Sequence, residues 1–157
     1  FFIPYIQPIL KQNGMPEDLV YLAMIESGFN NHARSHAKAV GPWQFISATG
    51  KRYGLMVNWW VDERQDPEKA TRAAARHLKD LYQQFGDWYL AMAAYNCGAG
   101  CVRKAIRKGG SKDFWTLARR RALPAALSSA SRLMASRNAE PTRSPTIPTT
   151  KHLPVRF

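Results

Sequence analysis

Glu26 has the sequence setting of a general acid. It ends an apolar run, residues 19–25 (Leu-Val-Tyr-Leu-Ala-Met-Ile), and the pair Ser27-Gly28 that follows predicts the end of a helix. A carboxyl group carried by an apolar helix to a glycine-containing turn should lie at the edge of a hydrophobic core, where loss of water raises its pKa. Such a group can donate a proton near neutral pH. The simpler alternative is that Glu26 is a surface residue that merely ends the helix.

Two further segments combine glycine, an aromatic ring and a side-chain amide. Residues 41–45 read Gly-Pro-Trp-Gln-Phe, and residues 94–100 read Ala-Tyr-Asn-Cys-Gly-Ala-Gly. Glycine permits tight turns, and a side-chain amide can both donate and accept hydrogen bonds. We therefore expect these two segments and Glu26 to line a single cleft.

Glu26 stands without an obvious second catalytic carboxylate. Cleavage of a glycosidic bond normally uses two, one as the acid and the other as a nucleophile or base. Asp62, Glu63 and Asp66 are the other candidates, but their polar setting before a helix start favours a hydrated turn and a helix N-cap. A lone acid indicates a substrate that supplies its own nucleophile.

The apolar periodicity predicts helices and no strand, so the expected fold class is all-α. The clearest helix start is Asp66-Pro67, and Gly86 ends that helix. His77 lies on its apolar face, so we assign it to core packing and not to a ligand. The segment of residues 27–40 has mostly short, polar side chains, which predict a loop. The expected helices span about residues 3–12, 16–26, 41–53, 67–85, 88–95 and 99–108.

The positive charge is concentrated towards the C-terminal end. The formal net charge is +12, but residues 1–102 hold 10 Lys and Arg against 9 Asp and Glu, whereas residues 103–157 hold 13 against 2. Basic segments attract nucleic acid, anionic lipid or cell wall alike, so this charge names no substrate. After Leu117 the chain is rich in Arg, Ala, Ser, Pro and Thr without sustained periodicity. We expect a domain at residues 1–117 and an irregular, mainly disordered basic tail at residues 118–157.

Cys97 and Cys101 lie four positions apart, without histidines at zinc-site spacing, so we expect no metal and no other cofactor. A disulfide needs a tight and suitably oriented turn, so this spacing favours unpaired thiols but leaves the redox state open. No apolar run is long enough to span a membrane, and the N-terminus lacks a signal-peptide pattern. A chain that begins at Phe1 without methionine indicates a fragment or a processed form.

Three motifs, in this order and spacing, resemble those of the lytic transglycosylases with a goose-lysozyme-like (soluble transglycosylase) domain. The motifs are Glu26-Ser27, Gly41-Pro42-Trp43-Gln44-Phe45 and Ala94-Tyr95-Asn96. Segments 14–17, 49–55 and 113–115 extend the similarity over residues 1–117. The resemblance implies a compact lysozyme-like multi-helix domain with a glycan groove.

The resemblance also implies cleavage of the bond between N-acetylmuramic acid and N-acetylglucosamine in peptidoglycan, with a 1,6-anhydro end in place of water addition. Glu26 would protonate the leaving oxygen and then accept the proton of the sugar's C6 hydroxyl. Tyr95 would form a hydrogen bond near the reacting centre, and Asn96 would hold the adjacent loop. Trp43 would form part of the cleft wall, although packing is its simpler role. The expected substrate-binding residues are Ser27, Ser35, Gln44, Phe45, Ile46, Tyr95 and Asn96.

Peptidoglycan glycan strands in the bacterial cell envelope are the expected partner, and we expect a monomer. Specific nucleic-acid binding is not expected, and membrane association would require segments outside this chain. Three alternatives remain open: a goose-type muramidase that hydrolyses the same bond, a non-catalytic glycan-binding domain and, least favoured, nucleic-acid binding through residues 103–157.

The chain departs from the family pattern after its Phe-Trp segment. In place of a proline, a Glu-Thr pair and a closing Tyr-Val-Pro-Lys run, it reads Leu117-Ala118-Arg119-Arg120-Arg121. We hypothesise that the reading frame changes after about Leu117, because a mixture of Arg, Ala, Ser and Pro is typical of a GC-rich gene read out of frame. An intact frame in the encoding DNA would exclude this hypothesis.

Overall fold

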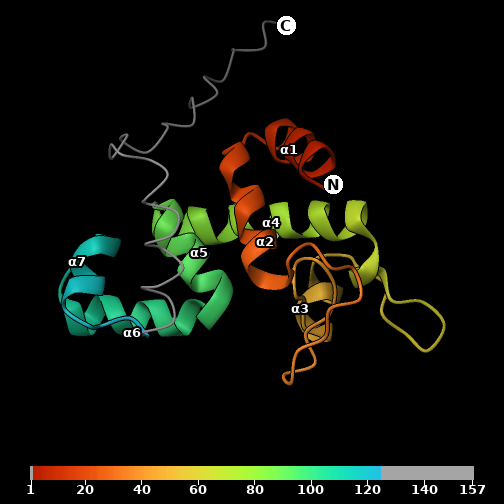
Figure 1. Ribbon diagram of the computed structural model, residues 1–157. Helices are drawn as coiled ribbons and strands as arrows, with labels where there is room; N and C mark the ends of the chain where they lie inside the picture. Colours follow the sequence, from red (N-terminus) through yellow and green to blue (C-terminus); the bar gives the residue numbers. More distant parts are fainter. Residues whose placement is uncertain (1, 125–157) are drawn as a thin grey trace, which may run out of the picture.

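One long helix organises the described part of the chain. The computed structural model describes residues 2–124. Helix α4 (Pro67–Phe85) runs through the middle of the molecule and packs against α1 (Ile3–Gln12) and α5 (Trp88–Cys97) (Figure 1). Within residues 2–124 the β-structure is limited to isolated β-bridges. The all-α fold class predicted from the sequence is therefore confirmed.

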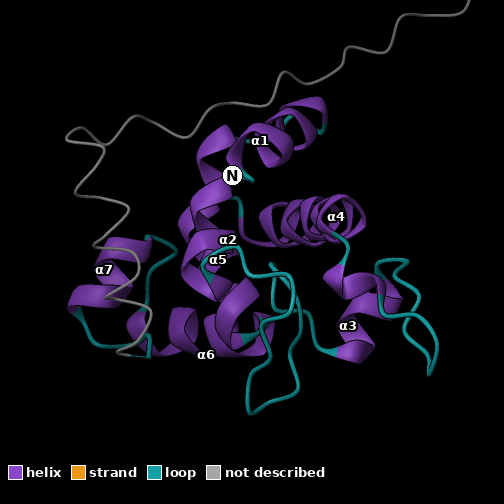
Figure 2. Cartoon of the chain, turned by 45° about the vertical axis from the view of Figure 1, so that its right-hand side comes forward, coloured by secondary structure: helices purple, strands orange, loops and turns teal. Residues whose placement is uncertain are grey.

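The remaining helices are short and lie around α4. Helix α2 leads away from α1, whereas α6 and α7 lie together at one end of the molecule (Figure 2). These elements are η1 (Glu17–Leu19), α2 (Val20–Ser27), α3 (Ser47–Arg52), η2 (Glu63–Gln65), α6 (Ala99–Gly109) and α7 (Phe114–Arg119). The helix predicted at 16–26 is thus a 3-10 turn that continues into α2.

The sequence determines both ends of α4. Asp66 Oδ1 accepts hydrogen bonds from the backbone N–H groups of Glu68 and Lys69, at 3.0 and 2.9 Å. Gly86 ends the helix with a left-handed φ of 71°. The buried side of α4 carries several alanines, which allow the neighbouring helices to approach closely. Those of them with no solvent exposure are Ala70, Ala73 and Ala74.

The predicted helix over residues 41–53 is wrong for its first half. Val40 and Phe45 exchange two backbone hydrogen bonds of 3.0 and 3.1 Å, which close a tight loop before α3 begins. Gly41 has a φ of +86°, and a Cβ atom there would lie 1.8 Å from the carbonyl oxygen of Arg64. The Gly-Pro pair therefore marks a close approach of two backbones and not a helix start.

Helix α7 was not predicted, and packing continues beyond the expected boundary at residue 117. Asp113 caps α7 by accepting a 2.6 Å hydrogen bond from the backbone N–H of Thr116. Phe114 and Leu117 are buried, and so is Leu123, at 7% exposure. The predictions for the rest of the basic tail, including its disorder and the change of reading frame, lie mainly outside the described residues.

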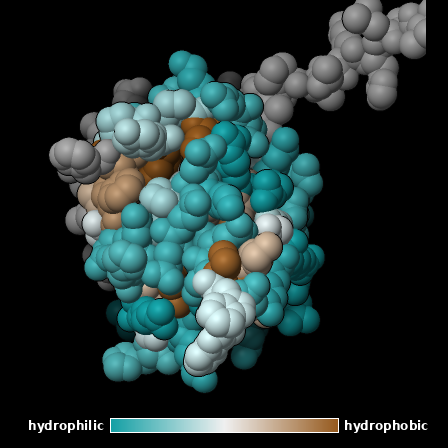
Figure 3. Space-filling view, turned by 90° about the vertical axis from the view of Figure 1, so that its right-hand side faces the viewer, coloured by the Kyte–Doolittle hydropathy of each residue, from teal (hydrophilic) through white to brown (hydrophobic). Residues whose placement is uncertain are grey.

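A loop at residues 56–62 carries exposed aromatic side chains. Trp59 and Trp60 are 90% and 88% exposed, and Met56 and Val61 add further exposed apolar surface. Asn58 holds the loop, because its Oδ1 accepts from the backbone N–H groups of Trp60 and Val61, both at 2.8 Å. The side of the molecule to which this loop projects is otherwise mostly hydrophilic (Figure 3). No helix within residues 2–124 has both the length and the apolar content to cross a membrane.

Candidate active site

Glu26 lies in a cleft of about 700 Å³ formed by segments that are far apart in the sequence. The end of α2 supplies Glu26, and the loop before α3 supplies Ser35 and Gln44. Tyr95 and Asn96 come from α5. The structure therefore brings the three sequence motifs together at one site.

The carboxyl group of Glu26 is partly buried. Gly28, with a left-handed φ of 61°, ends α2 two residues later, so the helix delivers Glu26 to the cleft without extending across it. Desolvation raises the pKa of Glu26 above its ordinary value, and a hydrogen bond from Asn96 opposes this rise with a smaller effect. The group is thereby suited to hold a proton at a higher pH than an exposed glutamate does.

The two serines have structural hydrogen bonds. Ser27 Oγ donates to the carbonyl oxygen of Pro42 at 2.9 Å and lies 3.2 Å from that of Ala23, so it ties the end of α2 to the 41–46 loop. Ser27 does not line the cleft, in contrast to Ser35. Ser35 Oγ accepts a 3.1 Å hydrogen bond from the backbone of Ala39.

Gln44 both shapes the loop and faces the cleft. Its Nε2 donates to the carbonyl oxygens of Gly41 and Ala33, at 2.8 and 3.2 Å, and its backbone has a positive φ of 48°. The amide nitrogen is therefore committed to the loop, whereas Oε1 has no partner among the described residues. Phe45 is 2% exposed and Ile46 is 45% exposed, and both line the cleft.

Tyr95 connects the cleft to the core. Its hydroxyl donates a 2.7 Å hydrogen bond to the backbone carbonyl of Trp43. Burial raises the pKa of Tyr95 well above its ordinary value, and the nearby Glu26 raises it further, so the phenol stays protonated. Trp43 is fully buried and does not line the cleft; its Nε1 donates to Thr71 Oγ1 at 2.9 Å. The structure thus assigns Trp43 to the core and not to the cleft wall.

Residues 4–118 match the family described as the transglycosylase SLT domain. The chain belongs to this family. Membrane-bound lytic murein transglycosylase D of Escherichia coli K12 is 43% identical over 121 residues, which cover 74% of this chain and 27% of that protein. Peptidoglycan transglycosylase gp16 of phage T7 is 42% identical over 112 residues, which cover 69% of this chain and 8% of that protein.

The fold of this SLT domain also has a solved counterpart. An inactive mutant of lytic transglycosylase Slt from Pseudomonas aeruginosa superposes with a TM-score of 0.67 at 21% identity, over 87% of this chain and 24% of that protein. The lysozyme-like fold class expected from the sequence is confirmed by this match. The chain spans about a quarter of the length of murein transglycosylase D.

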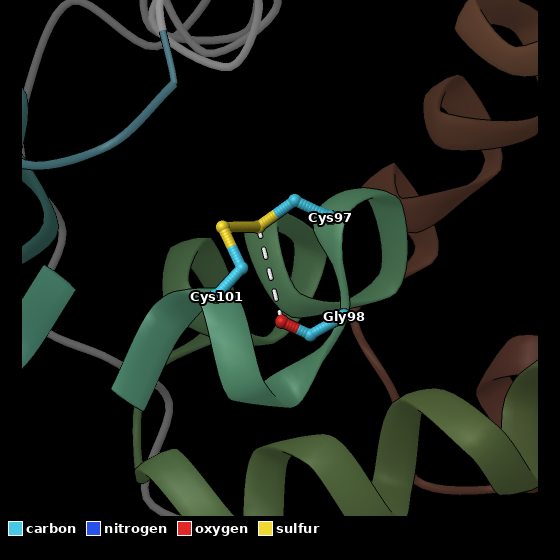
Figure 4. Close-up of a disulfide and its surroundings, with 3 residues drawn as sticks. All are labelled: Cys97, Gly98 and Cys101. Atoms are coloured by element: carbon cyan, nitrogen blue, oxygen red, sulfur yellow. Dashed lines mark hydrogen bonds between the residues drawn. A yellow bond between two sulfur atoms is a disulfide. The ribbon is translucent and has the colours of Figure 1, made fainter. Parts of the chain in front are cut away.

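The cysteines of this SLT domain form a disulfide, which corrects the expectation of unpaired thiols. Cys97 ends α5 and Cys101 lies in the first turn of α6, with their Cα atoms 5.9 Å apart (Figure 4). Gly98, at a φ of 87°, turns the chain between the two helices and supplies the orientation that sequence spacing alone could not establish. The bond thus cross-links the junction that directly follows Asn96.

A row of side chains from α4 and Tyr53 completes the cleft, and sequence analysis did not identify it as part of the site. His77 stacks on Tyr53 with ring centroids 4.7 Å apart, and burial lowers the pKa of His77 to about 4, so it is neutral at neutral pH. Asp80 accepts a 3.0 Å hydrogen bond from the Tyr53 hydroxyl. Both His77 and Asp80 line the cleft, and their spacing of three positions on one helix was the available signal.

The three acidic residues near position 63 have structural partners and do not line the cleft. Asp62 pairs with Arg64 at 2.7 Å, which lowers the pKa of Asp62, and Glu63 pairs with Lys69. Asp66 is the N-cap of α4, as predicted. Residues 2–124 contain no group of three or more His, Cys, Asp or Glu side chains that could hold a metal ion.

Proposed function

We propose that this SLT domain cleaves the bond between N-acetylmuramic acid and N-acetylglucosamine of peptidoglycan in the bacterial cell envelope, and that it leaves a 1,6-anhydromuramic acid end. The family and the names of two relatives, a lytic murein transglycosylase and a peptidoglycan transglycosylase, support the substrate and the reaction class. The observation that carries the proposal is the partly buried Glu26, with its raised pKa, in a cleft of about 700 Å³.

Glu26 transfers the proton twice in this proposal. The protonated carboxyl donates to the glycosidic oxygen as the bond to the anomeric carbon breaks, and N-acetylglucosamine leaves with its new hydroxyl. The resulting Glu26 carboxylate then accepts the proton of the C6 hydroxyl, whose oxygen bonds to the anomeric carbon of the same sugar. No water is consumed, and Glu26 returns to its protonated form.

The surrounding residues bind and orient in this scheme. Asn96 donates to Glu26 Oε1 and stabilises the carboxylate that forms midway through the reaction. Gln44 Oε1 and the Ser35 hydroxyl face the cleft as hydrogen-bonding groups for the sugars. Tyr95, Phe45 and Ile46 shape the wall, and Ser27 acts indirectly through its hydrogen bond to the 41–46 loop.

Hydrolysis by a goose-type muramidase is the second candidate, and Asp80 is the observation that favours it. Asp80 gives the cleft another carboxylate, and inverting glycosidases use such a group to activate water. The hydrogen bond from Tyr53 already engages one Asp80 oxygen. The two mechanisms differ in their products, because hydrolysis adds one water for each cleaved bond and leaves a reducing end where transglycosylation leaves the 1,6-anhydro end.

Digestion of purified peptidoglycan sacculi by the wild type and by Glu26→Gln tests the proposal. We expect the wild type to release muropeptides that are lighter than hydrolysed ones by one water, and Glu26→Gln to release none. Predominantly reducing ends would establish the muramidase alternative. Binding to sacculi without release by the wild type would establish a glycan-binding domain, and equal release by both proteins would remove Glu26 from the mechanism.

A further inference from the structure

A second groove, of about 500 Å³, adjoins the Glu26 cleft. Its walls are the C-terminal end of α4, the exposed side of α6 and the segment after α6. Gln84 and Arg103 line both the groove and the cleft, so the two lie side by side. A polymer bound in the cleft could therefore extend a substituent into this groove.

The charged side chains that line the groove are all basic: Arg103, Arg107 and Lys112. None of the three forms an ion pair or a hydrogen bond with another residue of the described part, residues 2–124. Arg103 and Arg107 lie four positions apart on α6, a spacing at which like charges repel each other within a helix. Three exposed basic side chains at one groove, without a charged partner among residues 2–124, favour a ligand that carries negative charge.

The lining of the groove is partly apolar. Phe85 and Ile106 contribute this surface, and Gly100 adds no side chain. A lining that combines apolar surface with cations suits a short peptide that has aliphatic carbons and carboxylate groups. An uncharged sugar chain would gain no ion pair from these three exposed cations.

We propose that this groove binds the acidic peptide stem attached to the N-acetylmuramic acid residue held in the cleft. This inference rests on the proposed function. The acetylated sugars at the scissile bond are uncharged, whereas the peptide attached to the lactyl group carries free carboxylates. Arg103 and Arg107 pair with carboxylate oxygens through their planar guanidinium groups, and Lys112 contributes a point charge. The groove thereby favours strands whose peptides carry free carboxylates over strands whose peptide carboxylates are neutralised.

Arg107→Gln/Lys112→Gln is the test variant, because these two residues line the groove and not the cleft. Lys104→Gln/Lys108→Gln is the matched control. It also removes two positive charges, in this case both from α6, and neither lysine lines the groove. Soluble glycan strands with free peptide carboxylates are compared with the same strands after conversion of those carboxylates to amides.

We expect the test variant to lose roughly fivefold in kcat/KM on the free-acid strands, as two exposed ion pairs would give. On the amidated strands it should match the wild type, and the control should match the wild type on both. The advantage of the wild type should shrink as salt concentration rises. Equal loss on both substrates, or no loss on either, would overturn the proposal.

A binding measurement keeps this inference separate from the proposed function. The probe is the free peptide stem, titrated into the Glu26→Gln protein and into Glu26→Gln/Arg107→Gln/Lys112→Gln. We expect saturable binding to the former and binding weaker by roughly fivefold to the latter. If the wild type cleaves neither kind of strand but the peptide still binds in this way, the proposed peptide site is supported and the proposed reaction is contradicted. Equal binding to both proteins, or no binding to either, would contradict the assignment of the groove as a peptide site.

Discussion

The side-chain amide of Asn96 donates a hydrogen bond to Glu26 Oε1 at 3.3 Å and so joins the end of α5 to the end of α2. Burial raises the pKa of Glu26, and this hydrogen bond moderates the rise by stabilising the carboxylate. A group that must first donate a proton and then accept one needs both influences, because an excess of either would disable one of the two steps.

Asn96→Ala should move the pH profile of the proposed reaction. Loss of a donor to the carboxylate raises the pKa of Glu26 further, so the decline of activity at alkaline pH should occur at a higher pH. The maximal rate should fall roughly threefold to tenfold, because the anion formed midway loses one hydrogen bond. Rates of sacculus solubilisation across pH measure both effects. A lower rate with an unmoved alkaline limb would mean that Asn96 acts on the fold and not on Glu26.

Glu26→Gln should stabilise the fold at neutral pH. The raised pKa of Glu26 means that the folded state holds its proton more tightly than the unfolded state, whose pKa is near the ordinary 4.5. Folding stability therefore falls as pH rises from the unfolded pKa through the folded pKa. The cost is fully present above that window, and glutamine avoids it.

Thermal melts at two pH values check this sign. At pH 7 we expect Glu26→Gln to melt higher by roughly 1–3 °C, a small gain because the side chain is only partly buried. Below pH 4 the two proteins should melt together. A Gln variant that is less stable than the wild type at pH 7 would contradict the desolvated setting of Glu26.

The Cys97–Cys101 disulfide should matter to both stability and turnover. A cross-link that closes so short a loop stabilises the fold by about 2 kcal/mol in the chain-entropy account. Because Asn96 directly precedes Cys97, a looser junction should also weaken the contact with Glu26. Reducing agent should then slow the wild type by roughly twofold to fivefold.

Cys97→Ser/Cys101→Ser is the control for the disulfide. This variant should have the low rate without reductant and should not respond to it. Full activity of the double variant, with a lowered melting temperature alone, would show that the bond serves only stability.

Local sequence signals locate the acid and the helix ends. An apolar run followed by Ser27-Gly28 predicts a helix end that carries Glu26, and Asp66-Pro67 predicts the start of α4; both depend on residues within one helical turn. The side chains expected to bind sugars come from the family motifs. The place of Glu26 at a helix end and the start of α4 can therefore be predicted from the amino-acid sequence alone, whereas the sugar-binding roles stay predictions.

Features that depend on distant residues cannot be predicted in this way. The loop at 41–46 has the sequence of a helix start, because Gly41-Pro42 gives no sign that the Arg64 backbone lies against it. The spacing of His77 and Asp80 puts them on one side of α4, but that Asp80 lies at the cleft depends on Tyr53, which the end of α3 places beside α4. The disulfide requires the turn at Gly98, and this turn depends on the path of α5 and α6 together.

Arg64 holds the 33–46 loop in place, and its loss should be costly. The residue is 7% exposed. Its guanidinium pairs with both carboxylate oxygens of Asp62, at 2.8 and 2.7 Å, and donates to the carbonyl oxygens of Lys38 and Phe45, at 3.2 and 3.1 Å. Arg64→Met keeps much of the volume but leaves these acceptors unsatisfied, so we expect a loss of about 2–4 kcal/mol in the free energy of unfolding.

Arg72→Met is the matched control, since Arg72 forms an exposed pair with Glu68 at 2.9 Å within α4. It should cost less than about 1 kcal/mol, and denaturant titration distinguishes the two magnitudes. Activity should fall with Arg64→Met even where the protein remains folded, because the loop that presents Gln44 to the cleft loses its support. Equal stability losses for the two variants would mean that the Arg64 network contributes no more than a surface ion pair.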